Sequence, residues 1–500
     1  MENLKKCLCK ILIDNFGAYS KKYFEILQEM SKHKVFDLSE IAKNTNCAFK
    51  MITDLVKIFE SGFVRVEKDK YTLTNELLAE VQKMSKEYEK QLNFDYQKAV
   101  EKYQNHTKNF LADKVNLDHI SATCGTAIDR AIYLIKNFDV KNIKIAMLGD
   151  HDFTSIALKI LCKDCDVTVF DVDRDVLNFV RDFDCDIKTT YADFRFGIHN
   201  QSNDMFDLVF TDPPYTSNGM DCFLKNAKNL CKKNIYSSII CSYYCGDLSI
   251  KNGLNVQKTI LNNGLYIESI EHKFNKYNFA ESLGYCSDLY CFRMVNIAWT
   301  KNSLKLDNVL NIYTHGIMSN ESLYKFEELN NLTKLTSSPA SDKDINIFTA
   351  IKSTLNSDNF NLPDVVYLSN FQDYSINFVQ FLLNLNFKTL YFRSKQSLEN
   401  IVDTKALKQF VDIFAEQNGV YKLCLKNNVY SLFVSKHYLT LKNFVKYVSK
   451  QEDFKFCISK DVENDVVYKK YCNDIICSMP YDILFDLIKN NWHNCGSKVY

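Results

Sequence analysis

The stretch Ile145–Leu158, IAMLGDHDFTSIAL, constrains the fold more than any other part of the chain. It predicts a buried strand that stops on Gly149, a tight turn with two carboxylates, and then a helix. A second apolar segment, FDLVF, runs into TDPPY at Thr211–Tyr215. The carboxyl ends of neighbouring parallel strands line one crevice in an open α/β sheet. We therefore expect both segments to face the same site.

Strand and helix patterns alternate between about residues 118 and 300. The runs IKIAML, VTVFDV, IKTTYAD, FDLVFTD and SSIICSYY have strand character, and FTSIALKIL, RDVLNFVRDF and a segment near 218–231 have helical character. Such alternation predicts βαβ units and a mostly parallel sheet. We therefore predict an α/β fold with a Rossmann-like, methyltransferase-type doubly wound sheet at 118–300.

The regions before this core have their own patterns. Residues 1–80 predict a winged helix, with a capped helix after Phe36, an amphipathic helix at Ala48–Phe59 and a hairpin about Lys68-Asp69. Residues 81–117 are charged and contain neither proline nor glycine, which predicts one connecting helix.

The chain of 500 residues leaves room for a further domain after the core. A boundary is indicated by the Ser/Thr/Asn-rich stretch around 337–339. The runs DVVYL, INFVQFLLNL and KTLYFRS predict strand, helix and strand, and Lys422–Lys436 predicts a hairpin about Asn427-Asn428. We interpret 301–500 as an accessory α/β domain of unknown role, and a degenerate second copy of the core is one interpretation.

Charge and hydropathy limit the partners. The chain has 62 basic and 61 acidic residues, so no global positive field attracts nucleic acid. The second helix of the winged-helix region carries only Lys50 and Lys57 as cations, which favours a lid or dimerisation module in a homodimer over DNA binding. No window approaches 18 apolar residues, and Lys10 and Asp14 interrupt the first apolar run. We therefore expect no membrane span and no signal peptide.

Eighteen cysteines are many for a chain of this length. Cys241, Cys291 and Cys457 lie in apolar segments, where free cysteine behaves as a small hydrophobe. Cys162 and Cys165 form a CxxC pair, but two ligands fall short of the four that a structural zinc needs. We expect a reduced, cytoplasmic protein without a metal site.

Acidic residues follow the predicted strands in order. Asp150 and Asp152 lie in the first turn, where carboxylates can stabilise a cationic ligand or accept a proton from an amine. Asp152 has a competing interpretation as the N-cap of the helix from Phe153, and His151 between the two acids is expected to point outward. Asp171 ends the second strand, where an acid typically accepts the ribose hydroxyls of an adenosine.

The later strands complete the series. Asp193 follows the third strand and is a candidate to accept the adenine amino group. Asp212 precedes Pro213 and Pro214, which fix φ and remove two amide donors, so the loop holds the carboxylate toward a substrate amine. Tyr215 can stack on that amine through a cation–π contact. The turn at Gly149 lacks the second and third glycines of a dinucleotide-binding fingerprint, which disfavours NAD as the ligand.

In these segments the chain resembles the branched-chain polyamine synthases, the N4-bis(aminopropyl)spermidine synthases. The resemblance is carried by LGDHDFTSIAL, FDVD, YADFR, TDPPY, FNKY at Phe274–Tyr277 and ATCGTAIDRAIYL at Ala122–Leu134, and it covers roughly residues 1–300. It implies an N-terminal winged helix, a Rossmann-like aminopropyltransferase domain and decarboxylated S-adenosylmethionine as donor. It also matches Asp152 to the acid that handles the substrate amine, and it adds Tyr277 as a substrate-binding candidate.

Three residues depart from the family pattern. His151 replaces the middle acid of a Gly-Asp-Asp-Asp turn, Tyr215 stands where the archaeal pattern has Glu, and Lys276 replaces the Glu of FNEY. Each change makes the site less negative, which points to an acceptor that is shorter or carries a carboxylate.

The leading hypothesis is an aminopropyltransferase that acts on a polyamine or related amine without a metal. One alternative is an adenine-N6 methyltransferase acting on DNA or RNA, because Asp-Pro-Pro-Tyr is also typical of that class. A second alternative is a non-catalytic winged-helix regulator that senses an adenosyl ligand.

Overall fold

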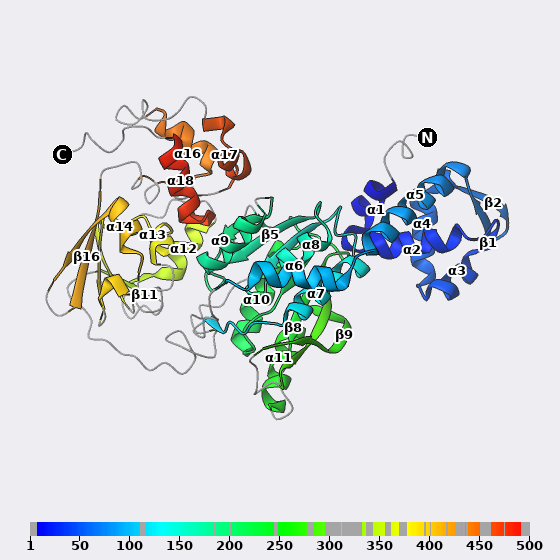
Figure 1. Cartoon of the computed structure of the whole chain (residues 1–500), viewed down its shortest axis with the longest axis horizontal. Coiled ribbons are helices and arrows are strands. Elements are labelled where there is room, and N and C mark those ends of the chain that lie inside the picture. The colour runs from blue at the N-terminus through cyan, green and yellow to red at the C-terminus, as the bar shows by residue number, and fades with distance from the viewer. Residues whose placement is uncertain are drawn as a thin grey trace.

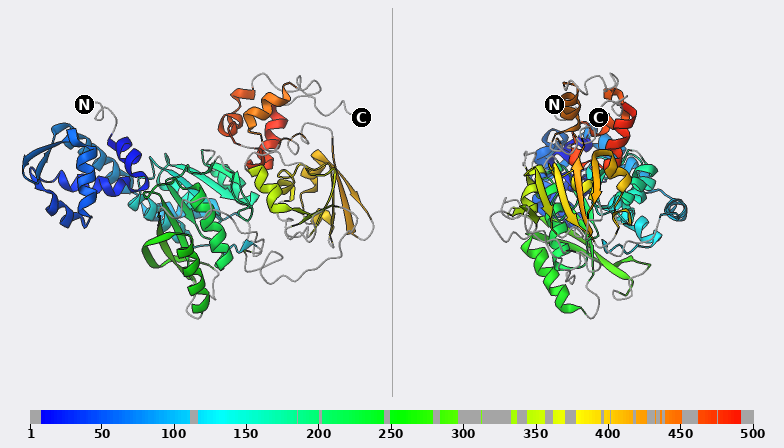
Figure 2. Two further views of the ribbon diagram at one scale, coloured as in Figure 1. Left: turned by 180° about the vertical axis from the view of Figure 1, so that it is seen from behind. Right: turned by 90° about the vertical axis from the view of Figure 1, so that its left-hand side faces the viewer.

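The computed structural model describes most of residues 8–295 and several shorter segments after them. The described ranges are 8–110, 117–184, 186–199, 202–244, 249–278, 284–295, 312, 333–336, 344–355, 362–369, 378–394, 397–400, 402–416, 419–426, 432, 436, 439–450, 462–474 and 476–491. Three units follow one another along the long axis, with the N-terminal and C-terminal units at opposite ends of the central one (Figures 1 and 2).

The N-terminal unit consists of helices and a small antiparallel sheet of order β1-β3-β2. The Asp37 carboxylate caps α3 by accepting the backbone N–H of Ser39 at 2.7 Å. These elements agree with the predicted helices and hairpin, while the assignment as a winged helix stays a prediction. The elements are α1 (Leu8–Phe16), α2 (Ser20–Met30), β1 (Phe36–Asp37), α3 (Leu38–Thr45), α4 (Phe49–Ile58), β2 (Phe63–Glu67) and β3 (Lys70–Leu73).

The segment predicted as one connecting helix contains two. Helix α5 (Asn75–Leu92) packs on the N-terminal unit, where Phe24 and Tyr88 bring their ring centroids to 5.0 Å. Helix α6 (Tyr96–Thr107) packs on the central unit. The prediction was wrong because Asp95 caps a new helix by accepting the Lys98 N–H at 3.1 Å.

The central unit is built on a seven-stranded sheet of order β6-β5-β4-β7-β8-β10-β9. Strands β6, β5, β4, β7 and β8 are parallel to one another, and β10 is antiparallel to both of its neighbours, β8 and β9. In chain order this is 3-2-1-4-5-7-6, so the predicted Rossmann-like, methyltransferase-type sheet is confirmed. Its strands are β4 (Lys144–Leu148), β5 (Asp166–Asp171), β6 (Lys188–Tyr191), β7 (Leu208–Thr211), β8 (Ser238–Tyr243), β9 (Leu265–Lys276) and β10 (Cys286–Met294).

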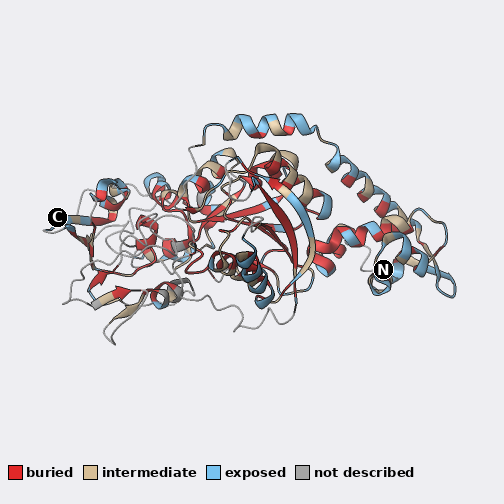
Figure 3. Ribbon diagram, turned by 90° about the horizontal axis from the view of Figure 1, so that it is seen from below, coloured by how far each residue is buried: buried red, intermediate tan, exposed pale blue. Residues whose placement is uncertain are grey.

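Helices cover both faces of this sheet, and alternate strand residues serve two separate cores. In β4, Ile145 and Met147 enter the core under one set of helices, whereas Ala146 and Leu148 enter the core on the opposite face. The buried strands contrast with the exposed outer faces of the helices in Figure 3. The first set is α7 (Cys124–Asn137), α8 (Thr154–Leu161) and α9 (Arg174–Phe183), and the second is α10 (Ser217–Leu230) and α11 (Ile250–Asn262).

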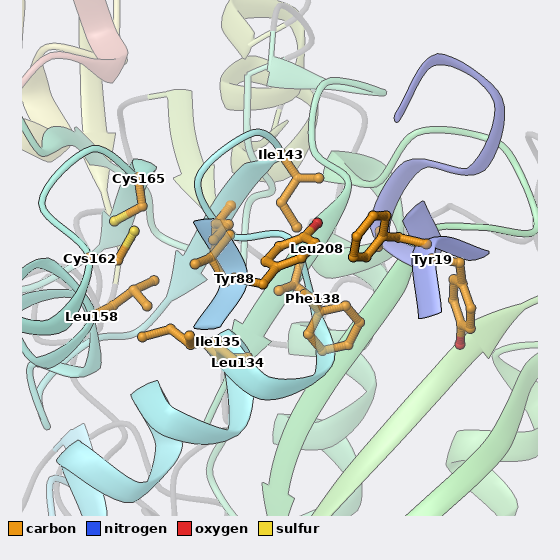
Figure 4. Close-up of a cluster of buried hydrophobic side chains, with 14 of the residues drawn as sticks. Tyr19, Tyr88, Leu134, Ile135, Phe138, Ile143, Leu158, Cys162, Cys165 and Leu208 are labelled. Atoms are coloured by element: carbon orange, nitrogen blue, oxygen red, sulfur yellow. The ribbon is translucent and has the colours of Figure 1, made fainter. Parts of the chain in front are cut away.

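The N-terminal unit shares one hydrophobic core with the central unit. Tyr19 and Tyr88 belong to the same buried cluster as Ile135 and Leu208 (Figure 4). The Lys21 ammonium donates to the backbone carbonyl of Ile135 across this junction at 2.5 Å. The N-terminal unit therefore packs directly against the central unit.

The C-terminal unit contains a six-stranded sheet of order β12-β11-β13-β14-β16-β15. The first four strands are parallel, and β16 runs antiparallel to β14 and β15. This confirms the predicted accessory α/β fold and its strand-helix-strand. The elements are β11 (Thr333–Thr336), β12 (Ile345–Asn346), α12 (Ile347–Leu355), β13 (Val365–Leu368), α13 (Phe378–Leu382), β14 (Thr389–Arg393), α14 (Thr404–Phe410), β15 (Val411–Ala415), β16 (Val420–Leu425), α16 (Leu441–Val448), α17 (Val466–Tyr471) and α18 (Tyr481–Asn491).

Two sequence-based expectations fall wholly or partly outside the described residues. A hairpin was predicted at Lys422–Lys436. Its first strand corresponds to β16, which pairs with β14 and with the preceding strand β15. The predicted turn residues Asn427 and Asn428 lie outside the described residues. The boundary residues 337–339 also lie outside them. No helix within the described ranges is long and apolar enough to cross a bilayer.

Candidate active site

A cavity of about 370 Å³ opens at the carboxyl ends of β4, β5 and β7. This is the point where the strand order reverses, and ligands bind there in open α/β sheets. Its walls combine acids with aromatic and aliphatic side chains. The lining residues are Leu117, Asp118, His119, Ile120, Arg130, Gly149, Asp150, His151, Asp152, Thr154, Asp171, Val172, Phe194, Phe210, Asp212, Pro213, Pro214, Tyr215, Phe223, Tyr244, Ser249, Asn252 and Tyr277.

The turn after β4 has a backbone that suits close ligand approach. Gly149 has φ +68°, in the left-handed region that glycine adopts without strain. Phe153 also has a positive φ, +48°, and it precedes α8. A bulky residue is costly in this conformation, and such outliers gather at functional turns. Gly149 lies in the cavity wall, whereas Phe153 is buried behind it and sets the start of α8.

Asp150 and Asp171 form the buried acidic end of the cavity. The Asp150 carboxylate accepts the Ser155 hydroxyl and the Ser155 N–H, while the Asp150 N–H donates to Asp171 at 3.0 Å. Burial raises the pKa of Asp150 to about 7. Burial, together with the nearby Asp173 charge, raises the pKa of Asp171 to about 6. Both acids favour a ligand that brings hydroxyl donors or positive charge.

Arg130 is the principal site residue that sequence analysis missed. It lies on α7, and its side chain is fully buried. Its guanidinium donates to Asp152 at 2.8 Å and to Asp212 at 2.6 Å. It also donates to Asn275 and to the Tyr277 hydroxyl, at 2.7 and 3.2 Å. One cation thus joins the loops after β4 and β7.

A signal for Arg130 was present in the sequence. Ala127, Ala131 and Leu134 form an apolar stripe on α7, and Arg130 lies on the same buried face. A charged residue is almost never fully buried unless it is paired. An arginine within an apolar helical stripe therefore indicates acidic partners elsewhere in the fold.

The Asp-Pro-Pro-Tyr loop after β7 is held by a tyrosine pair. The Tyr215 hydroxyl donates to Asp212 at 3.0 Å, and the Tyr277 hydroxyl donates to the other Asp212 oxygen at 2.7 Å. The two hydroxyl oxygens lie 3.0 Å apart. Burial raises the pKa of Asp212 against the lowering effect of Arg130. The predicted residues Asp212, Pro213, Tyr215 and Tyr277 therefore meet in one cluster.

Asp152 lies in this cluster and does not cap α8. The N-cap residue of α8 is Phe153, and the side chain that accepts an N–H of its first turn, that of Ser155, is Asp150. One Asp152 oxygen accepts the Ala122 N–H at 2.7 Å, and the other accepts Arg130. The cap-only interpretation was therefore wrong, because the left-handed Phe153 displaces the helix start by one residue.

His151 points differently from the expectation as well. It lines the cavity and stacks on His119, with ring centroids 4.0 Å apart. Its Nε2 lies 3.2 Å from the Ser121 hydroxyl. The expectation of an outward-pointing turn residue was wrong, because the segment before α7 folds over the turn and gives the ring a partner.

Two further residues lie away from the cavity. Asp193, predicted to bind the adenine, pairs with Arg195 at 2.6 Å and lines a smaller cavity of about 20 Å³ instead. Its local partner, two residues along the chain, turns it aside, so that prediction is not met. Lys276 was expected to add charge near the site, but it is exposed and absent from the lining.

Charge in the cavity is one-sided. Its lining includes the carboxylates of Asp118, Asp150, Asp152, Asp171 and Asp212. Among the described lining residues the only lysine or arginine is Arg130, whose guanidinium is already bonded to two of these acids. Such a cavity can bind hydroxyls and cations, and it can accept a proton at a carboxylate.

Fold and cavity together define a Rossmann-like sheet of the methyltransferase type with a ligand-sized cavity at its switch point. Residues 98–331 match the family described as the branched-chain polyamine synthase A C-terminal domain. Over this segment the match agrees with the family resemblance seen in the sequence. The match begins at residue 98, so it leaves out the whole of the predicted winged helix at 1–80.

Known proteins similar to this chain include two from Methanocaldococcus jannaschii. An uncharacterised protein is 24% identical over 308 residues, covering 55% of this chain and 76% of its own length. An N(4)-bis(aminopropyl)spermidine synthase is 25% identical over 193 residues. That match covers 37% of this chain and only 54% of the synthase.

Among solved structures, the branched-chain polyamine synthase of Thermus thermophilus has been determined in complex with N4-aminopropylspermidine and 5′-methylthioadenosine. It is 16% identical to this chain with a TM-score of 0.38, and the match covers 61% of this chain and 96% of that one.

Proposed function

We propose that the chain transfers an aminopropyl group from decarboxylated S-adenosylmethionine to a polyamine or related amine. The lone pair of the acceptor nitrogen forms a bond to the aminopropyl carbon attached to sulfur. The carbon–sulfur bond breaks, its electrons stay on sulfur, and neutral methylthioadenosine leaves. The new ammonium then loses one proton to a carboxylate or to water. No metal is required, because the sulfonium is already an activated leaving group.

The observation that carries the proposal is the charge of the cavity. A full S-adenosylmethionine would bring an α-carboxylate into a cavity whose described walls offer acids and one arginine that is already paired. Burying a charge without a partner is costly. The decarboxylated donor lacks that carboxylate and keeps a sulfonium and an ammonium, both of which suit carboxylates. The matched synthase family points in the same direction.

Each of the lining residues is assigned a role from its position in the cavity. Asp171, at the end of β5, is assigned to the ribose hydroxyls, and Gly149 and Asp150 to the sulfonium side of the donor. Asp152 and Asp212 are assigned to the acceptor amine, with Asp152 as the candidate to take its proton. Tyr215 and Tyr277 hold Asp212 in place through their hydroxyls. Orientation and fixed charge then provide most of the acceleration.

The acceptor is proposed to be a polyamine, with branched products where an internal nitrogen attacks. Of the three departures from the family pattern, Tyr215 and His151 line the cavity and Lys276 does not. Lys276 therefore adds no positive charge to the cavity that would favour an acceptor with its own carboxylate. A cationic acceptor agrees better with the acids that remain.

The test uses the full chain with both donors and a panel of polyamines, followed by mass spectrometry. Aminopropylated amine together with methylthioadenosine is the expected product pair. Methylated product with S-adenosylhomocysteine would contradict the proposal and favour a methyltransferase. Binding of the donor without any product would favour a non-catalytic sensor.

A further inference from the structure

The C-terminal unit packs on the edge of the central sheet next to the cavity. Strand β6 is the edge strand, and residues around α17 cover it. The Tyr471 hydroxyl lies 3.1 Å from the Thr189 hydroxyl, and the Lys188 ammonium pairs with Asp474 at 2.7 Å. The Lys470 ammonium donates to the Ile187 carbonyl. An edge strand exposes unpaired backbone groups, and this contact covers them.

The loop that follows β6, residues 192–199, divides its aromatic side chains between two cores. Phe194 lies in the core of the central sheet, 4.7 Å from the Phe223 ring, and lines the large cavity. Phe196, two residues later, lies in the core of the C-terminal unit. A single short loop therefore joins the cavity wall to the second core.

Hydrogen bonds make this loop a stiff connection. The Ala192 N–H donates to the Asp171 carbonyl at 2.9 Å, and the Asn226 amide donates to the Phe194 carbonyl at 2.9 Å. The Phe196 N–H donates back to the Asp193 carbonyl at 3.0 Å. Phe194 and Phe196 thus belong to one hydrogen-bonded loop that is also bonded to the end of β5, where Asp171 lies.

We propose that the C-terminal unit positions the nucleoside end of the cavity, with Phe196 as the positioning residue. Asp171 and Phe194 line the same cavity, one with a carboxylate for hydroxyls and the other with a ring face for a flat base. None of the described residues that line this cavity comes from the C-terminal unit. The C-terminal unit holds the 192–199 loop so that the Asp171 carboxylate and the Phe194 ring keep their spacing. The inference rests on the proposed function, because it assumes an adenosyl ligand.

The experiment measures methylthioadenosine binding to the full chain by calorimetry. In Phe196→Ala the loop loses its packing in the core of the C-terminal unit. The affinity is expected to fall about tenfold, because small misplacements of groups in a site are costly. Phe196→Leu keeps most of the packing and should restore the affinity. In the transfer assay the KM for the donor should rise, while kcat at saturating donor and the KM for the acceptor stay unchanged.

Phe444→Ala is the matched control, because Phe444 is equally buried in the second core but lies on α16 and outside both cavities. It should lower the melting temperature without lowering the affinity. Unchanged affinity in Phe196→Ala, or an equal loss in Phe444→Ala, would overturn the inference. Asp171→Ala separates the two claims. If it too leaves binding unchanged, the adenosyl cavity itself is refuted, whereas a loss confined to Asp171→Ala refutes only the role of Phe196.

Discussion

The two large sheets of this chain share one strand order and differ in what their strands end on. Strands β11, β13, β14, β16 and β15 occupy the places of β4, β7, β8, β10 and β9, with the same directions. The second sheet keeps a two-residue strand, β12, where the first has β5 and β6. It therefore has the order of a shortened copy of the first.

The residues that follow corresponding strands differ between the two sheets. Strand β4 is followed by Gly149-Asp150, whereas β11 is followed by Ser337-Ser338. Strand β7 is followed by Asp212 and two prolines, whereas β13 is followed by Ser369. The same topology thus occurs with and without the acids. The comparison teaches that the fold supplies the crevice, and that the loop residues supply the chemistry.

The largest expected effect concerns the acid at the end of β4. Asp152→Asn removes the charge that faces the acceptor amine, so turnover should fall about 10²–10⁴-fold, the usual contribution of general acid–base catalysis. The measurement is the rate of methylthioadenosine release at saturating substrates. Ser369→Ala is the control in the second sheet, because Ser369 follows β13, the strand that occupies the place of β7, and it should leave the rate unchanged.

Near wild-type turnover in Asp152→Asn would contradict this contrast between the two sheets, because loss of an acid from the first sheet would then affect the rate no more than loss of a serine hydroxyl from the second. The proton would in that case pass to Asp150 or Asp212. The melting temperature is part of the readout, since Asp152 also accepts Arg130 and its loss removes half of a buried ion pair.

The next effect is on stability. Arg130→Gln leaves the Asp152 and Asp212 carboxylates without their common cation, and breaking a buried pair costs about 3–5 kcal/mol. The free energy of unfolding from denaturant titration should fall by that amount. Arg174→Gln is the control, because Arg174 pairs with Asp403 at a partly exposed contact between the two units. Such a pair is worth about 0–1 kcal/mol. Equal losses in the two variants would contradict the central place given to Arg130.

A smaller effect is expected at the end of β5. Asp171→Ala removes the acceptor for the ribose hydroxyls, and a hydrogen bond to a charged group is worth about 1.5–3 kcal/mol. The affinity for the donor should therefore fall by about one to two decades in calorimetry, while kcat at saturating donor changes little. A kcat effect larger than the affinity effect would move Asp171 from binding to chemistry.

The pH dependence should be the mildest of these effects. Burial raises the pKa of Asp150 to about 7 and that of Asp171 to about 6, so the folded chain holds protons that the unfolded chain has released. The stability contributed by these groups should rise as pH falls from about 8 toward 4. Affinity for the cationic donor should move the opposite way, rising about tenfold between pH 6 and pH 8 as Asp150 loses its proton. Asp150→Asn should flatten the upper part of that profile, and an unchanged profile would contradict the assignment.

The sequence was informative wherever a local pattern determines the structure. The five parallel strands of the first sheet, Gly149 and the acids after β4, β5 and β7 follow from hydrophobic periodicity and the rule for parallel sheets, whereas the antiparallel pair β9 and β10 was not predicted. Arg130 and Asp193 did not follow, because their partners are fixed by three-dimensional packing and by a neighbouring side chain. The shared strand order of the second sheet was also hidden, since topology can be kept while the residues that mark it are replaced.

The most direct test of the account compares the affinities of the chain for decarboxylated and intact S-adenosylmethionine in one calorimetric series. The two ligands differ only by the α-carboxylate, which meets acids and an already paired Arg130. The account predicts that the decarboxylated ligand binds at least about tenfold more tightly, the equivalent of about 1.4 kcal/mol. Equal affinities, or tighter binding of intact S-adenosylmethionine, would contradict it.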